Sequence, residues 1–190
     1  ERYFLNEESW SEDEKKAYMT KLNGLMRDFH ENFLQAARDY AEAGAYCEAV
    51  RVLRSCGDVK PMLRYYEAYY LEKAGKTEEA MAVYAEAEKV DPGCCFPNKL
   101  EDIAVLSDAK DKGFPMAAYY LGDLWYDKKQ YEAARECWEM AAEKVPDYPT
   151  VWRNLSLVYF NKTGEKEKAL KAIEKAFELP FEGHMLMAPE

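Results

Sequence analysis

Residues 115–148 read PMAAYYLGDLWYDKKQYEAARECWEMAAEKVPDY, and this stretch decides the fold that the sequence predicts. A segment rich in aromatic residues and alanine is followed by a polar turn and then by a second alanine-rich segment. The second segment carries Ala134, Trp138 and Ala141, whose offsets of four and three residues place them on one stripe of a helix. Because the two alanines let a neighbouring helix approach and the tryptophan fills the space between them, we expect a packed helical hairpin.

The same stripe recurs four times along the chain. Its first alanine is Ala49, Ala80, Ala134 and then Ala169, at intervals of 31, 54 and 35 residues. The middle interval equals one repeat of 34 residues plus 20 further residues, which indicates an insertion between the second and third hairpins. Self-similarity at such a period is typical of stacked helical repeats.

These segments resemble the tetratricopeptide repeat, in which an aromatic residue, Leu-Gly and Tyr precede Ala, a large apolar residue, Ala and Pro. The best match is the stretch quoted above, which supplies Leu121, Gly122, Trp125, Tyr131, Ala134, Trp138, Ala141 and Pro146. The resemblance implies an all-α fold, a right-handed α-solenoid of tetratricopeptide-type hairpins with one inserted helix. It also implies a protein that binds other proteins.

The best match departs from the pattern only at its opening aromatic, which is Ala118, and two of the other three matches depart at a few positions. Residues 149–180 have Ser156 in place of the glycine and one extra residue in the turn before Gly164. Residues 61–92 carry Arg64 and Glu67 where apolar residues are usual. Residues 30–57 match through Phe33, Ala37, Tyr40, Gly44, Tyr46, Ala49 and Leu53.

The repeats and the segments between them predict five parts. These are an N-terminal helix packing on the array (1–29), the first two hairpins (30–92), an inserted helix (93–114), two further hairpins (115–182) and a flexible tail (183–190). Ser11 and Glu14 have the spacing of a capping box at the start of the N-terminal helix. Asn98 and Glu101 have the same spacing, and we expect the inserted helix over residues 98–111.

A more particular resemblance concerns the sequence FPNKLEDIAVL at residues 96–106 together with the two repeats that follow it. The combination is similar to the C-terminal repeat region of a bacterial family in which a long β-rich domain of unknown function precedes the repeats. That resemblance implies that the natural protein is longer, and it allows an association with carbohydrate utilisation.

Composition argues against several classes of partner. The chain of 190 residues has a net charge of −10 and a pI near 4.9, a field that repels nucleic acid phosphates and anionic lipid headgroups. No apolar run is long enough to span a bilayer. Cys47, Cys56 and Cys137 stand in helical patterns, so we expect small buried side chains in a reducing compartment and a cytoplasmic protein.

Residues with the chemistry of catalysis or metal binding are sparse. The two histidines, His30 and His184, lie far apart in the sequence, and His184 is accompanied only by methionines. Cys94 and Cys95 are adjacent and have no second pair at zinc spacing. No glycine-rich phosphate loop or focused carboxylate pair is present. We therefore expect no cofactor, no metal and no catalysis.

In stacked hairpins the first helix of each pair lines the concave side of the array. The positions of these helices that lie outside the packing stripe are mostly aromatic, with few charges, as at protein interfaces. The predicted partner-binding residues are Arg38, Tyr65, Tyr69, Tyr119, Asp123, Tyr126, Arg153, Phe160 and Asn161, with Leu34, Glu72 and Leu157 beside them. Packing of these tyrosines inside the protein is the competing interpretation.

Three functions stay open on the sequence alone. The chain is a non-catalytic scaffold that binds a protein or peptide segment on its concave face, or a structural or dimerising tail of a larger, carbohydrate-associated bacterial enzyme. A fragment of an α/α-toroid glycosidase is the third, although that fold does not need the alanine stripe. Weak self-association through the repeat ends is compatible with the first two.

Overall fold

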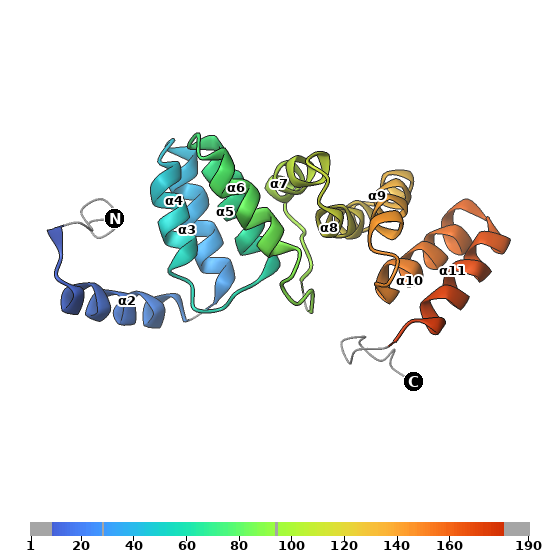
Figure 1. Ribbon diagram of the computed structural model, residues 1–190, viewed down its shortest axis with the longest axis horizontal. Helices are drawn as coiled ribbons and strands as arrows, with labels where there is room; N and C mark the ends of the chain where they lie inside the picture. The colour runs from blue at the N-terminus through green and yellow to red at the C-terminus, as the bar shows by residue number, and fades with distance from the viewer. Residues whose placement is uncertain (1–8, 28, 94, 181–190) are drawn as a thin grey trace. The chain divides into compact units, whose positions relative to one another are not determined.

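The computed structural model describes residues 9–27, 29–93 and 95–180, and all regular structure in these ranges is helical (Figure 1). The chain divides into two compact units, Glu1–Pro92 and Gly93–Glu190. The predicted all-α class, built from tetratricopeptide-type hairpins and one extra helix, is confirmed.

The described part of each unit contains two helical hairpins and one further helix. The N-terminal unit contains α2 (Glu12–Met26), α3 (His30–Glu42), α4 (Tyr46–Arg54), α5 (Pro61–Lys73) and α6 (Thr77–Ala87). The C-terminal unit contains α7 (Leu100–Asp111), α8 (Pro115–Asp127), α9 (Tyr131–Lys144), α10 (Pro149–Val158), the π-helical turn η2 (Tyr159–Thr163) and α11 (Lys166–Glu178). The pairs α3 with α4, α5 with α6, α8 with α9 and α10 with α11 are the four hairpins, and α7 packs on α8.

The core of each unit is built from the stripe that repeats in the sequence. Its leading alanines are all buried, namely Ala49, Ala80, Ala134 and Ala169. The larger side chain one turn later is buried in the first three hairpins, as Leu53, Tyr84 and Trp138. In the last hairpin Ile173 stays partly exposed. The stripe thus buries its large side chain in the first three hairpins and only partly in the fourth.

The turns inside the hairpins need a residue in the left-handed conformation just after the first helix. Glycine supplies it in three of them, at φ 80° for Gly44, 79° for Gly75 and 75° for Gly164. In the third hairpin Lys129 takes this place at φ 62°. This conformation is energetically unfavourable for any residue that has a Cβ atom.

The extra residue in the last repeat is absorbed by a change of helix type. Residues Tyr159–Thr163 form the π-helical turn η2, in which one more residue fits into the turn than in an α-helix. The backbone N–H of Gly164 then donates to the carbonyl of Tyr159 and closes the turn. Phe160 and Asn161 therefore project from an irregular turn and not from a regular helix.

The two predicted helix starts have different outcomes. Ser11 and Glu14 form the predicted capping box of α2. None of the residues of α2 is buried, and its packing on the first hairpin stays a prediction. The inserted helix α7 starts two residues later than predicted. Its capping acid is Asp102 and not Glu101, because the Asp102 carboxylate accepts the backbone N–H groups of Asn98 and Lys99, each at 3.0 Å.

The cysteine prediction is correct for only part of the set. Cys137 is buried, Cys56 is partly exposed and Cys47 is exposed. Cys47 lies in the first turn of α4, on the side opposite the buried face of that helix, so it fills no space in the core. Cys94 and the predicted tail at 183–190 lie outside the described residues.

Candidate functional site

In the C-terminal unit, the predicted surface residues lie on the first helix of each hairpin and on the turn η2 that follows α10. Tyr119, Asp123 and Tyr126 lie on α8, and Arg153 lies on α10. The opposite face of α10 is buried through Val151, Leu155 and Val158 and holds the helix in the stack. Each helix begins with a proline at its first turn, where the ring sets the backbone angle and no hydrogen bond is lost.

Asp123 is the centre of a hydrogen-bond cluster that joins three helices. Its Oδ1 accepts the indole N–H of Trp138 on α9 at 3.1 Å and the amide N–H of Asn154 on α10 at 3.0 Å. The same indole also donates to the carbonyl of Tyr119 at 3.2 Å. Tyr119 itself hydrogen-bonds the carboxylate through its side chain. The cluster fixes α10 against α8 and α9.

The surroundings of Asp123 change the acidity of two groups. Burial raises the pKa of the Asp123 carboxyl to about 7, and the hydrogen bonds from Tyr119, Trp138 and Asn154 act in the opposite direction. Burial, followed by the nearby Asp123 charge, raises the pKa of the Tyr119 hydroxyl far above its usual range. Tyr119 is therefore a neutral hydrogen-bond donor within the cluster at physiological pH.

Tyr119 is only 7% exposed, so it does not offer a contact surface. Its ring packs edge-on against Tyr148 at 5.1 Å between centroids and lies 5.2 Å from the ring of Tyr120. Tyr126 is half-buried, with its ring 5.2 Å from Tyr131 and 5.5 Å from Trp138. For Tyr119 the competing interpretation, packing inside the protein, describes the structure.

The exposed part of the predicted surface lies on α10 and η2. Phe160 is 58% exposed and Leu157 is 39% exposed, which is unusual for large apolar side chains. Arg153 and Asn161 are exposed beside them. The described side chains leave the Arg153 guanidinium with one hydrogen bond, to its neighbour Asn154 at 3.4 Å. We call Arg153, Leu157, Phe160 and Asn161 the α10 surface.

In the N-terminal unit, two of the three predicted residues are buried. Tyr65 is fully buried, and its hydroxyl donates to Glu88 at 2.7 Å. Arg38 is buried beneath the ring of Tyr66, which lies 5.9 Å from its guanidinium carbon. Both side chains are long enough to reach a neighbouring helix of the same unit, so they pack instead of pointing outward. Only Tyr69 keeps partial exposure, with the Lys73 ammonium 5.0 Å from its ring.

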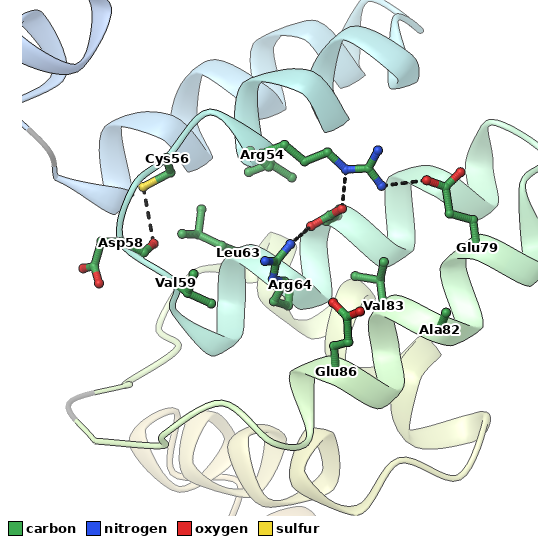
Figure 2. Close-up of a pocket in the computed structure, with 12 residues that line it drawn as sticks. Arg54, Cys56, Asp58, Val59, Leu63, Arg64, Glu79, Ala82, Val83 and Glu86 are labelled. Atoms are coloured by element: carbon green, nitrogen blue, oxygen red, sulfur yellow. Dashed lines mark hydrogen bonds and ion pairs between the residues drawn. The ribbon is translucent and has the colours of Figure 1, made fainter. Parts of the chain in front are cut away.

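Two features of the structure were not predicted from the sequence. Asn154 was not among the predicted residues, although it connects α10 to Asp123. Asn154 lies three residues after Val151 and four before Val158, on the stripe of α10 that is buried, and this spacing was the available signal. The N-terminal unit also contains a cleft of about 380 Å³ between α4, α5 and α6 (Figure 2). Arg64 and Glu67 line it and are the residues that depart from the repeat pattern.

Among residues 9–27, 29–93 and 95–180, no three His, Cys, Asp or Glu side chains are close enough to hold a metal ion. No helix within these ranges has the length and hydropathy needed to cross a membrane. His30 lies at the start of α3, with its Nδ1 4.0 Å from the carboxylate of Asp58.

Two family models match the C-terminal unit. One, described as TPR repeat, matches residues 122–163, and the other, described as Tetratricopeptide repeat, matches residues 149–182. Both matches fall on the hairpins formed by α8 to α11, in agreement with the stripe of small and large residues.

Solved structures similar to this chain include those of MamA and YrrB. A crystal structure of MamA is 18% identical, with a TM-score of 0.40, over 87% of this chain and 86% of that one. The structure of YrrB, titled a TPR protein with an unusual peptide-binding site, is 18% identical with a TM-score of 0.37, over 85% of this chain and 74% of that one. With TM-scores below 0.5, these similarities carry no information on what this chain binds.

Proposed function

We propose that this chain, a tetratricopeptide repeat protein, is a non-catalytic scaffold that binds a protein or peptide segment on the first-helix face of its C-terminal unit. The observation that carries the proposal is the α10 surface, where Arg153 and Leu157 of α10 and Phe160 of η2 are exposed while the other face of α10 is buried. Arginine and aromatic residues contribute much of the binding energy at protein interfaces, because they combine contact area with a polar group.

The cluster around Asp123 supports this proposal. Its hydrogen bonds from Trp138 and Asn154 hold α10 in place before any partner arrives. A surface that is already ordered loses less conformational entropy on binding, so more of the contact energy appears as affinity. The partner segment that suits this surface has an apolar side chain for Phe160 and Leu157 and a carboxylate for Arg153.

Composition supports a proposal about where the protein works. We place the chain in the bacterial cytoplasm, away from nucleic acids and membrane surfaces. The net charge of −10 disfavours both kinds of polyanionic surface. Cys47, Cys56, Cys95 and Cys137 are free thiols, as is usual in a reducing compartment.

Affinity capture with matched variants tests the proposal. The parent chain, an Arg153→Glu/Phe160→Ser variant and a Glu136→Lys control are immobilised and exposed to a lysate of the source cells. Glu136 is exposed on α9, the second helix of its hairpin, so its replacement alters charge away from the α10 surface. We expect a protein that the parent and the control retain and the double variant loses, while all three keep the same helical circular dichroism. Equal capture by the double variant would contradict the proposal that the partner binds to the α10 surface.

One observation favours the second candidate function, a dimerising or structural part of a larger protein. On α11, the last described helix, Leu170 is 58% exposed and Phe177 is 84% exposed, on a helix that has its alanines buried. An apolar face at the end of a repeat array is suited to stacking on further protein, including a second copy. Sedimentation velocity distinguishes this case: dimers that disappear in a Leu170→Glu/Phe177→Glu variant support it, and a monomer at all concentrations opposes it.

A further inference from the structure

The cleft in the N-terminal unit lies between α4, α5, α6 and the segment at residues 55–60 (Figure 2). It belongs to a different unit from the α10 surface, and it is a second site beyond the function proposed above. Its volume of about 380 Å³ falls at the lower end of the range for ligand pockets, which run from about 300 to 1,000 Å³. The space therefore fits one or two side chains and not a whole folded element.

Apolar side chains form two opposing walls of the cleft. Val59 and Leu63 line one side, and Val83 and Ala82 of α6 line the other, as Figure 2 shows. Leu63 and Val83 are almost fully buried, whereas Val59 is half exposed at the opening. Apolar walls suit the methylene groups of a long side chain, provided that its polar end lies near charged groups at the cleft.

Between the walls, two arginines are neutralised by carboxylates of the protein. Glu67, only 2% exposed, accepts Nε of Arg54 and Nη1 of Arg64, each at 2.6 Å. Arg54 also donates to Glu79 at 2.7 Å. Charge-assisted bonds this short fix the positions of all four side chains. The arginines therefore have their carboxylates already and do not attract an anionic ligand.

The charges that line the cleft leave a negative excess. Two arginines stand against four carboxylates, those of Asp58, Glu67, Glu79 and Glu86, which gives the lining an excess of two negative charges. Two lysines outside the lining offset this excess, because Lys60 lies 3.6 Å from the Asp58 carboxylate and Lys76 lies 3.8 Å from the Glu79 carboxylate. In the described part of the chain, the carboxylate of Glu86 has no hydrogen bond or ion pair and is exposed on the α6 side of the cleft.

From this arrangement we propose that the cleft binds an arginine side chain presented by a partner protein. The stem of the arginine lies between Val59 and Val83, and its guanidinium pairs with Glu86. Arginine suits the cleft better than lysine because a guanidinium is weakly hydrated, planar and able to bond a carboxylate through two N–H groups at once. The existing network around Glu67 stays intact when the side chain enters.

Chemical-shift mapping of the ¹⁵N-labelled full chain with N-acetyl-arginine methylamide tests this proposal. We expect saturable shifts confined to amides lining the cleft, with those of Val59, Leu63, Val83 and Glu86 among the largest. Replacing Glu86→Gln should weaken the binding at least about threefold, because one charge-assisted pair is lost. Glu78→Gln is the matched control: it removes the same charge from an exposed position of α6 outside the cleft and should leave the affinity unchanged.

Two further probes separate the proposal from weaker alternatives. N-acetyl-citrulline methylamide has nearly the same shape without the charge and should cause no saturable shift. Spermidine carries charge without a guanidinium and should bind more weakly than the arginine probe at equal ionic strength. Equal binding of citrulline or spermidine, shifts spread over the whole surface, or an unchanged affinity in Glu86→Gln would overturn the proposal. Because the probe does not use the α10 surface, either outcome leaves the proposed scaffold function to its own test.

Discussion

The indole of Trp138 lies so close to the backbone of Gly122 that a Cβ built on the glycine would be 2.4 Å from the indole Nε1. The tryptophan cannot move away freely, because its N–H donates to the Tyr119 carbonyl and to Asp123. The glycine of the repeat pattern therefore has a local cause in this hairpin, the close approach of one large side chain. In the second hairpin, Ala68 occupies the same repeat position, and the smaller residue Tyr84 stands at the position of Trp138.

We predict that Gly122→Ala destabilises the protein. Overpacking of a core contact costs about 1–3 kcal/mol, which exceeds the roughly 0.5–1 kcal/mol that alanine contributes in a helix. Urea unfolding followed by circular dichroism measures the change. Gly24→Ala is the control, because no atom lies within 4 Å of its added Cβ, and it should not lower stability. In a Trp138→Tyr background the penalty of Gly122→Ala should shrink, and an unchanged penalty would contradict the assigned contact.

The buried carboxylate of Glu67 should be needed for the stability of the folded protein only while both Arg54 and Arg64 are present. Glu67→Gln leaves the guanidiniums of Arg54 and Arg64 without their buried partner, and we expect a loss of about 1–3 kcal/mol, since both arginines keep partial access to water. The double variant Arg64→Leu/Glu67→Leu restores the apolar residues of the repeat pattern, while Arg54 keeps Glu79. It should recover most of the lost stability. Unfolding curves that rank the double variant below Glu67→Gln would show that the network has another role.

Asp123 should make stability decrease as pH rises toward neutrality. The pKa of its carboxyl is about 7 in the folded protein and near 3.9 in an unfolded chain. Between these values the folded state binds more protons than the unfolded state, so this group's contribution to stability falls with increasing pH. Asp123→Asn removes the titration, and its stability relative to the parent should rise from pH 5 to pH 8.

The pH prediction is checked by urea unfolding at several pH values, with all variants in the same buffers. Asp127→Asn, at an exposed position at the end of the same helix, is the control and should keep the pH profile of the parent. A constant difference between the parent and Asp123→Asn over the whole range would mean that Asp123 does not titrate in this window.

Lys129 offers a stabilising substitution. It occupies the left-handed turn position that glycine fills in the other three hairpins, at φ 62°. Relief of this conformation by Lys129→Gly, offset by the larger entropy of glycine in the unfolded chain, should give a net gain on the order of 0.5–1 kcal/mol. Lys129→Ala keeps the side-chain penalty and should give no gain. An equal gain from alanine would assign the effect to the lost lysine side chain instead of to the backbone.

The sequence was most informative where one residue determines one contact. The alanines of the stripe are buried because each lies where a partner helix must approach, and their spacing alone predicted the hairpins. The extra residue before Gly164 was also visible, although its form, the π-helical turn η2, was not.

The candidate surface was less predictable, because exposure depends on which neighbours a residue meets. Tyr65 and Arg153 hold equivalent repeat positions, yet Tyr65 is fully buried and bonded to Glu88, while Arg153 is exposed. The difference lies in the reach of the tyrosine and in the helices packed around it, and the repeat pattern specifies neither. The cleft beside Glu67 could be inferred only as a departure from the pattern, since the residues that line it come from three separate helices and the segment at residues 55–60.

The most direct test of the central claim is site-specific photocrosslinking from the α10 surface in source cells. A benzophenone amino acid replaces Phe160 in one version of the chain and exposed Glu136 of α9 in the other. The proposed scaffold predicts a discrete protein adduct from position 160 that is absent from position 136. Excess unlabelled parent chain should compete the adduct away, and excess Arg153→Glu/Phe160→Ser chain should not. The same adducts from both positions, or none from position 160, would contradict the claim that this face binds a partner.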